Sequence, residues 1–121
     1  MNRLRKSFSY AIQGILYGVA NEPNMKIHLL AALAALVMGV IAGLSRLEWA
    51  MLSLTIFMVL AAETVNTAVE RAIDLFSTQQ HPLAKIAKDL AAGGVLLAAV
   101  NAVVIAFILF GPYLIGILMK L

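Results

Sequence analysis

The chain contains no cysteine and few charged residues. Without a thiol it can form no disulfide, no thiolate metal site and no cysteine nucleophile. Only 12% of its 121 residues are charged and 63% are hydrophobic, whereas a typical soluble protein is about 45–50% apolar. This composition excludes an ordinary soluble domain and predicts a single membrane domain over residues 1–121.

The basic residues are also too few and too dispersed to form a nucleic-acid surface, so we expect no nucleic-acid partner. Most of them lie in the N-terminal region or between residues 71 and 88, whereas Arg46 and Lys120 lie elsewhere. Cytoplasmic segments of membrane proteins are enriched in Lys and Arg. We therefore expect the N-terminus and residues 71–88 on the cytoplasmic side of the inner (plasma) membrane.

The motifs of soluble kinases are absent as well. The sequence contains no GxxxxGK[ST], no HRD and no DFG, which excludes P-loop and protein-kinase mechanisms. Its glycines, including the pair Gly93 and Gly94 and the spaced pair Gly39 and Gly43, instead predict close packing between helices.

Apolar segments predict an all-α membrane protein. Residues 4–20 have their apolar side chains on one face, which is typical of an amphipathic helix on a membrane surface. The alternative is an amphipathic helix of a soluble core, which the apolar sequence that follows disfavours. Uncharged stretches then predict a multi-pass chain with transmembrane helices at about 28–44, 49–73 and 90–111.

Acidic and amide side chains interrupt the second transmembrane segment. Glu63, Asn66, Glu70 and Asp74 follow an uncharged run, and at about 100° per residue they fall within an arc of about 80° on one helix face. Glu63 lies about 21 Å into the segment and Glu70 about 31 Å, near the cytoplasmic boundary. A charge in mid-bilayer costs on the order of 2.5–3.5 kcal/mol, so this stripe predicts a functional site.

Further carboxylates are expected near the same membrane face. They are Glu22, at the end of the surface helix, and Asp89, at the start of the third transmembrane helix, and Lys88 and Arg3 lie beside them. Clustered oxygen ligands suit Mg²⁺, which combines a few carboxylates with phosphate oxygens. Such a cluster can neutralise the phosphates of ATP through the metal.

Three segments resemble the small prokaryotic lipid kinases of the diacylglycerol kinase family: NEPNMKIHL, ETVNTAVERAIDL and HPLAKIAKDLAAGGVLL. The resemblance covers about residues 3–110, and NEPNMKIHL, SRLEW and HPLAK are more similar to the Gram-positive branch, whose members phosphorylate undecaprenol. It implies a homotrimer of three-helix subunits, each with an N-terminal surface helix. It also implies active sites shared between neighbouring subunits at the cytoplasmic face of the bilayer, which transfer phosphate from MgATP to a lipid alcohol.

The resemblance implies roles for individual residues. Glu63 would be the general base on the lipid hydroxyl with Asn66 beside it, and Asp89 would orient the site. Glu22 and Glu70 would hold Mg²⁺. The other implied nucleotide contacts are Asp74 and His81 at the nucleoside end, Lys88 and Arg3 at the phosphates, Tyr10 in the nucleotide pocket, and Lys85.

Three positions depart from the diacylglycerol kinase pattern. This chain has Ala11 where those enzymes carry a serine, His28 where they carry a second glutamate, and Lys85 where they carry a glycine. The departures bear on the choice of lipid and on the contacts with the sugar of the nucleotide.

The leading interpretation is therefore a lipid kinase that acts on undecaprenol, with diacylglycerol as the alternative acceptor. A small proton or cation relay protein is a more remote alternative, because intramembrane carboxylates also mark ion paths. A relay predicts polar residues across the whole bilayer, and the first and third transmembrane segments lack them apart from Asn101. A structural subunit without chemistry leaves the alignment of Glu63, Asn66 and Glu70 unexplained.

Overall fold

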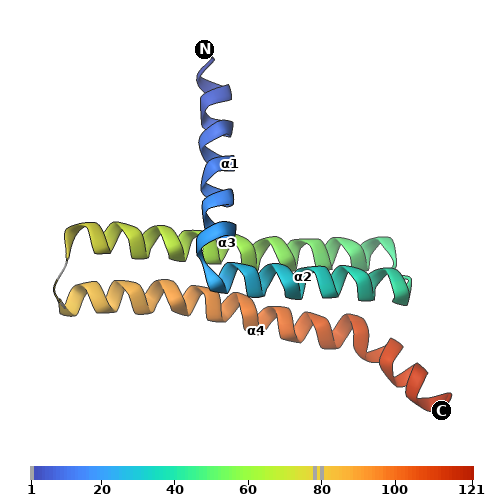
Figure 1. The fold of residues 1–121 in the computed structure, drawn as a ribbon. Coiled ribbons are helices and arrows are strands. Elements are labelled where there is room, and N and C mark those ends of the chain that lie inside the picture. The colour runs from blue at the N-terminus through green and yellow to red at the C-terminus, as the bar shows by residue number, and fades with distance from the viewer. Residues whose placement is uncertain (1, 78, 80) are drawn as a thin grey trace.

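The computed structural model describes residues 2–77, 79 and 81–121, which form helices and no strands. In chain order the helices are α1 (Arg3–Asn21), α2 (Pro23–Ala42), α3 (Arg46–Phe76) and α4 (Pro82–Met119). The last three lie side by side, and α1 projects sideways from them (Figure 1). Each of α2, α3 and α4 is long and apolar enough to cross a membrane.

The three apolar helices differ in length. The 20 residues of α2 span about 30 Å, which matches the hydrocarbon core of a bilayer. The 31 residues of α3 and the 38 of α4 exceed that thickness. The α3–α4 hairpin extends beyond the start of α2, at which α1 joins the bundle (Figure 1). One end of the hairpin therefore projects past the level of α1.

A break at Glu22 and Pro23 turns the chain from α1 into α2. Glu22 has an extended backbone, and Pro23 opens α2 at a position where its missing N–H costs no helical hydrogen bond. At the other end of α1, the Asn2 side chain caps the helix by accepting a hydrogen bond of 3.1 Å from the Leu4 N–H. These end signals give α1 its own direction, across that of the other helices.

The connection between α2 and α3 is compact because of two glycines. Gly43 ends α2 in the left-handed region, with φ 68° and ψ 49°, a conformation that glycine adopts without strain. Ser45 and Glu48 then form a reciprocal capping box at the start of α3. Gly39 lies against Trp49, so that a Cβ atom added there would be 2.7 Å from the indole ring.

A small apolar core lies at this end of the bundle, opposite the α3–α4 loop. It consists of Leu44, Leu52, Leu109 and Phe110. The Tyr113 hydroxyl of α4 donates a 3.3 Å hydrogen bond to Glu48 Oε1 of α3. Elsewhere most large apolar side chains are exposed, as expected for helices whose outer faces contact lipid.

The helix limits differ from those expected from the sequence. The first spanning helix was expected at 28–44 and begins at Pro23, while the second was expected at 49–73 and is longer at both ends. Both extensions come from end signals, the first-turn proline of α2 and the Ser45 cap of α3. The Arg3–Asn21 helix matches the range 4–20, and its location on a membrane surface stays a prediction.

The third spanning helix is expected at about 90–111, and α4 extends beyond this range at both ends. The helix begins at Pro82, because the His81 side chain caps it and Pro82 fits its first turn. It continues through Pro112 to Met119. Proline removes one helical hydrogen bond and crowds the preceding turn, which bends a helix without ending it, and α4 bends near its C-terminal end (Figure 1).

We predict that Gly39→Ala destabilises the fold by about 1–3 kcal/mol, the usual cost of overpacking, because its methyl group would displace Trp49. Thermal unfolding in detergent micelles measures the effect. The control is Gly116→Ala in α4, where a Cβ meets nothing within 4 Å. Equal melting temperatures for the two variants would contradict the assignment of Gly39 as a close-packed position.

Candidate active site

The stripe of polar residues on α3 goes from buried to exposed along the helix. Glu63 is 2% exposed and Asn66 6% exposed, whereas Glu70 is intermediate and Asp74 is exposed. Thr67, at the edge of the stripe, is also buried. The carboxylates therefore lie in progressively more polar surroundings towards the hairpin loop.

The position of α2 shows where this stripe leaves the bundle. His28 Nε2 lies 3.6 Å from Glu63 Oε2, which puts Glu63 level with the second turn of α2. Because α2 and α3 run antiparallel, the first residue of α2, Pro23, is level with about residue 68 of α3. Glu70 and Asp74 thus lie beyond the end of α2, on the projecting part of the hairpin.

Two buried polar atoms beside Glu63 have no hydrogen-bond partner among the described residues: Asn66 Oδ1 and Thr67 Oγ1. The Asn66 amide nitrogen donates to Glu70 Oε1 at 3.2 Å, which orients the amide. Thr64 of the same helix donates to the carbonyl four residues earlier, the usual partner of a helical threonine. Buried unpaired polar atoms are rare and often mark functional sites.

A polar cleft of about 710 Å³ lies between α3 and α4 at the hairpin end. Its charged lining residues form two ion pairs. Lys88 Nζ donates to Asp74 Oδ1 at 2.6 Å, and Lys85 Nζ donates to Asp89 Oδ2 at 2.5 Å. His81 also lines the cleft, and its Nδ1 accepts a hydrogen bond from the Leu83 N–H at 3.1 Å. This cleft therefore gathers most of the residues expected at the nucleotide.

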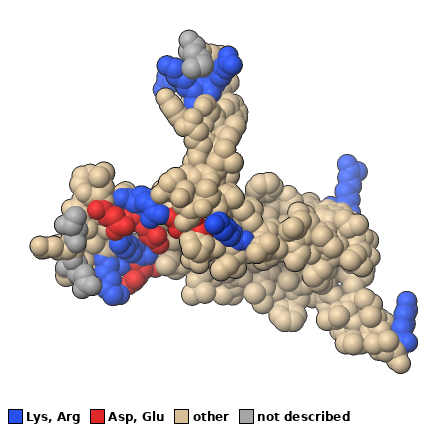
Figure 2. All heavy atoms as spheres, viewed as in Figure 1, with Lys and Arg blue, Asp and Glu red and all other residues tan. Residues whose placement is uncertain are grey.

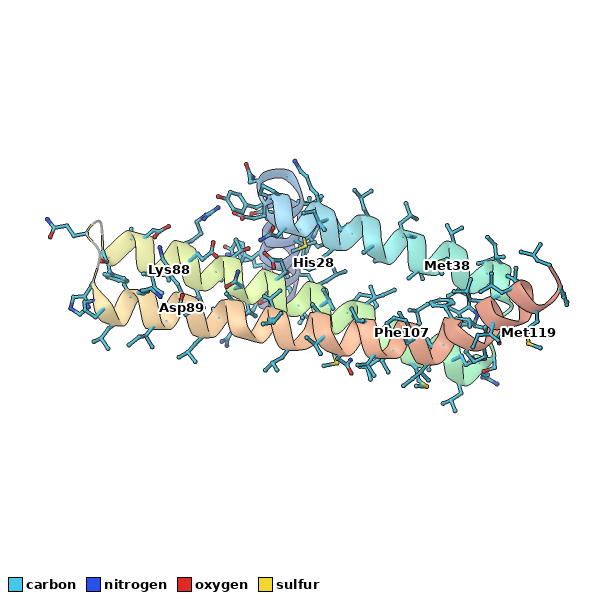
Figure 3. The ribbon with its side chains drawn as sticks, turned by 90° about the horizontal axis from the view of Figure 1, so that it is seen from below. His28, Met38, Lys88, Asp89, Phe107 and Met119 are labelled. Atoms are coloured by element: carbon cyan, nitrogen blue, oxygen red, sulfur yellow. The ribbon has the colours of Figure 1, made fainter. Side chains whose placement is uncertain are left out.

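A second, apolar pocket of about 300 Å³ lies further along the bundle, between α2, α3 and α4. The polar side chains in its lining are His28 and Thr55, and the Thr55 hydroxyl already donates to the Met51 carbonyl at 2.8 Å. His28 thus borders this pocket and contacts Glu63. In Figure 3, His28 lies between the Lys88 and Asp89 end of the bundle and the apolar end near Phe107.

Glu22 is held by α3. The Arg71 guanidinium donates to Glu22 Oε1 and, through Nε, to the Tyr17 hydroxyl at 3.2 Å. The Arg71 Cζ atom also lies 5.9 Å from the centre of the Tyr17 ring, within the range of a cation–π interaction. This group, which we call the Arg71 clamp, joins α1, the α1–α2 junction and α3.

The expected Mg²⁺ ligands are Glu22, at the α1–α2 junction, and Glu70 of α3, and both are carboxylates of the kind that Mg²⁺ takes. Glu22 pairs with the cationic group of Arg71, the residue next to Glu70 in the sequence, and Glu70 accepts a hydrogen bond from Asn66. Magnesium is usually bound by one or two carboxylates together with phosphates and water. Among the residues that the structure describes, no group of three or more His, Asp or Glu side chains is placed to hold a metal.

The other expected nucleotide contacts, Arg3 and Tyr10, lie on α1 and are exposed. Figure 2 shows the basic residues at the free end of α1 well separated from the mixed acidic and basic group at the hairpin. One copy of the chain therefore does not bring them to the cleft. Sequence reasoning missed Tyr17 and Arg71, because contacts between α1 and α3 leave no local pattern in the sequence.

Comparisons with known proteins bear on the family of the chain. Residues 9–110 match the family model described as prokaryotic diacylglycerol kinase. The chain is 41% identical to an undecaprenol kinase from Bacillus subtilis (strain 168), over 94% of this chain and 93% of that protein. It is 41% identical to a diacylglycerol kinase from Synechocystis, over 93% of this chain and 65% of that protein. A diacylglycerol kinase from Helicobacter pylori (strain 26695) is 30% identical over 98% of this chain and 89% of that protein.

We predict that Arg71→Gln loosens α1 from the bundle. The substitution removes the charge-assisted hydrogen bond to Glu22 and the contact with Tyr17, so local opening of α1 should become more frequent. Hydrogen exchange of the α1 amides measures this, with Arg5→Gln on exposed α1 as the control. Unchanged exchange in the Arg71 variant would show that the clamp does not hold α1.

Proposed function

Because the chain belongs to the prokaryotic diacylglycerol kinase family of lipid kinases, we propose that it transfers the γ-phosphoryl group of ATP to undecaprenol. The reaction takes place at the cytoplasmic face of the inner membrane. One observation carries this proposal: a buried carboxylate, Glu63, lies between an apolar pocket in the membrane-spanning bundle and a polar cleft on its projecting hairpin.

The apolar pocket suits a lipid alcohol. Its lining offers hydrocarbon almost throughout, and His28 connects it to the Glu63 carboxylate. A lipid chain entering from the bilayer can thus bring its hydroxyl to Glu63 while the chain stays in apolar surroundings. The unpaired Asn66 Oδ1 and Thr67 Oγ1 are further groups that can hydrogen-bond the hydroxyl or the incoming phosphoryl group.

The polar cleft suits the nucleotide. Asp74 lies about 16 Å from Glu63 along α3 at 1.5 Å per residue, a span that an extended nucleoside triphosphate bridges. With the nucleoside near Asp74 and His81, the phosphates extend past Glu70, one turn further along α3, and the γ-phosphate points towards Glu63, two turns beyond Glu70. Lys88, now paired with Asp74, is in reach of the phosphates once that pair opens.

Glu63 acts as the general base in this scheme. It accepts the hydroxyl proton while the lipid oxygen attacks the γ-phosphorus, and ADP leaves. Phosphoryl transfer depends mainly on positioning and charge neutralisation, so a small helical protein can supply what the reaction needs. Glu22 and Glu70 would hold Mg²⁺, which neutralises phosphate charge when it is bound. Asp89 would orient the Lys85 side chain, with which it pairs in the cleft.

Undecaprenol suits the pocket better than diacylglycerol, the alternative acceptor. A polyprenol is hydrocarbon apart from one hydroxyl, whereas diacylglycerol also brings two polar ester groups that lose hydrogen bonds when buried. The hydroxyl of Thr55 is already engaged, so the lining has little to offer those esters. The 41% identity to a protein named undecaprenol kinase supports the same choice.

We further propose that the chain acts as a homotrimer with α1 on the membrane surface. The sideways direction of α1 suits this location, because α2, α3 and α4 then cross the bilayer (Figure 1). Gly93 and Gly94 meet nothing within 4 Å inside one copy, which leaves this part of α4 open to a neighbouring helix. A neighbouring copy also provides a way for Arg3 and Tyr10 to reach a cleft.

The acceptor is tested by phosphorylation in mixed micelles with labelled ATP and either undecaprenol or diacylglycerol. We expect kcat/KM for undecaprenol to exceed that for diacylglycerol at least tenfold. Lipid products separated by chromatography identify the acceptor. Equal or faster turnover of diacylglycerol would refute the undecaprenol assignment, and no turnover of either lipid would refute the kinase proposal.

We predict that Glu63→Gln abolishes turnover, with a loss on the order of 10²–10⁴-fold for removal of a general base. The amide keeps the size of the side chain, so MgATP binding and assembly of the trimer, measured by calorimetry and chemical cross-linking, should remain. The matched control is Glu48→Gln at the opposite end of α3, which should leave turnover unchanged. Activity in the Glu63 variant close to wild type would exclude Glu63 as the base.

A further inference from the structure

A buried base must lose its proton after each turnover. In the proposed reaction the O–H bond of the lipid breaks, an O–P bond forms and the P–O bond to the leaving ADP breaks, while the proton moves to the Glu63 carboxylate. The Glu63 side chain is only 3% exposed. Direct release of this proton to water is therefore hindered, and Glu63 must be deprotonated before it can act again.

His28 is placed to take this proton. Its Nε2 atom lies 3.6 Å from Glu63 Oε2, and its side chain is 20% exposed, far more than that of Glu63. His28 also lies in the second turn of α2, close to the level at which the helix leaves the bilayer. Histidine both accepts and releases protons near neutral pH.

We propose that His28 relays the proton of the lipid hydroxyl from Glu63 to water. Neutral His28 accepts the proton from Glu63 on Nε2, and the resulting imidazolium ion releases a proton to water. Both side chains thereby return to their starting states, and the step needs no additional reactant. This role rests on the proposed function, because it requires Glu63 to be the base.

The surroundings of His28 offer no competing ionisable group in the described residues. From α3, Glu63 contacts it, while the pocket residues of α3 and α4 next to it are apolar or, for Thr55, a hydroxyl. On its own helix Lys26 lies about 200° around the axis, on the other side. Glu22 is paired with Arg71.

A structural role for His28 predicts a different outcome from a relay. If His28 only positions Glu63, a side chain that keeps a hydrogen-bond donor at the same place should preserve activity. Glutamine does so without titrating. His28→Gln therefore separates the two roles, and His28→Ala opens space in which imidazole added to the solution can replace the missing ring.

The test measures lipid phosphorylation by the full-length protein in mixed micelles. For His28→Gln we expect kcat to fall about 10–100-fold, with KM for the lipid and for MgATP within about twofold of wild type. For His28→Ala we expect a similar loss of kcat, with rescue that increases with imidazole concentration. Because glutamine carries no proton between Glu63 and water, the pH profile of kcat in the His28→Gln variant should differ from that of the wild type.

Two controls keep the outcomes distinct. Glu63→Gln should stay inactive in imidazole, because the base itself is missing, and thermal unfolding shows whether each variant is folded. A wild-type kcat with an unchanged pH profile in His28→Gln would overturn the relay. A loss of kcat in folded His28→Ala that imidazole does not restore would overturn it too. Both outcomes would leave the proposed function standing. Absence of lipid phosphorylation by the wild-type protein would overturn both.

Discussion

Burial of one carboxylate at the edge of the hydrocarbon is the constraint on which the rest of the site depends. A lipid hydroxyl lies in or near apolar surroundings, whereas the phosphates of a nucleotide require water, cations and metal. The catalytic group must be accessible from both phases. In the proposed reaction Glu63 lies between the two, because it is buried in the bundle near the first turns of α2, while the exposed Asp74 lies on the same helix face. A continuous helix is the simplest support for polar side chains that go from buried to exposed, because its geometry fixes their spacing.

The unequal helix lengths follow from the same requirement. If α3 and α4 were as short as the 20 residues of α2, the hairpin would end at the membrane surface. It would then have no residues beyond the bilayer to line the proposed nucleotide site. The additional turns form a polar cleft with one ion pair between the two helices, Lys88 with Asp74. In Figure 2 the visible acidic residues and several basic residues are gathered at this end of the bundle, while the stretch between its two ends is almost free of charge.

Sequence reasoning predicted the helices and the stripe because both depend on local periodicity. The positions of Glu63, Asn66 and Glu70 on one face follow from the helical repeat alone. The length of α4 could not be obtained in this way, because an uncharged run marks only the part of the helix after Asp89, although Lys85 and Asp89 pair four residues apart on the same helix. Hydrophobicity marks where a helix crosses the bilayer, and it does not mark where the helix ends.

Contacts between segments far apart in the sequence are the second kind of feature that the sequence could not predict. The Arg71 clamp is an example, because it joins α1 and the α1–α2 junction to α3. Glu22 precedes α2, and its carboxylate would be costly to leave unpaired at a side-chain exposure of 13%. The guanidinium of Arg71 supplies the compensating positive charge. Because Arg71 is next to Glu70 on α3, this ion pair connects the α1–α2 junction to the part of α3 that carries the polar stripe. A contact between residues 49 positions apart thus sets where Glu22 lies relative to the site.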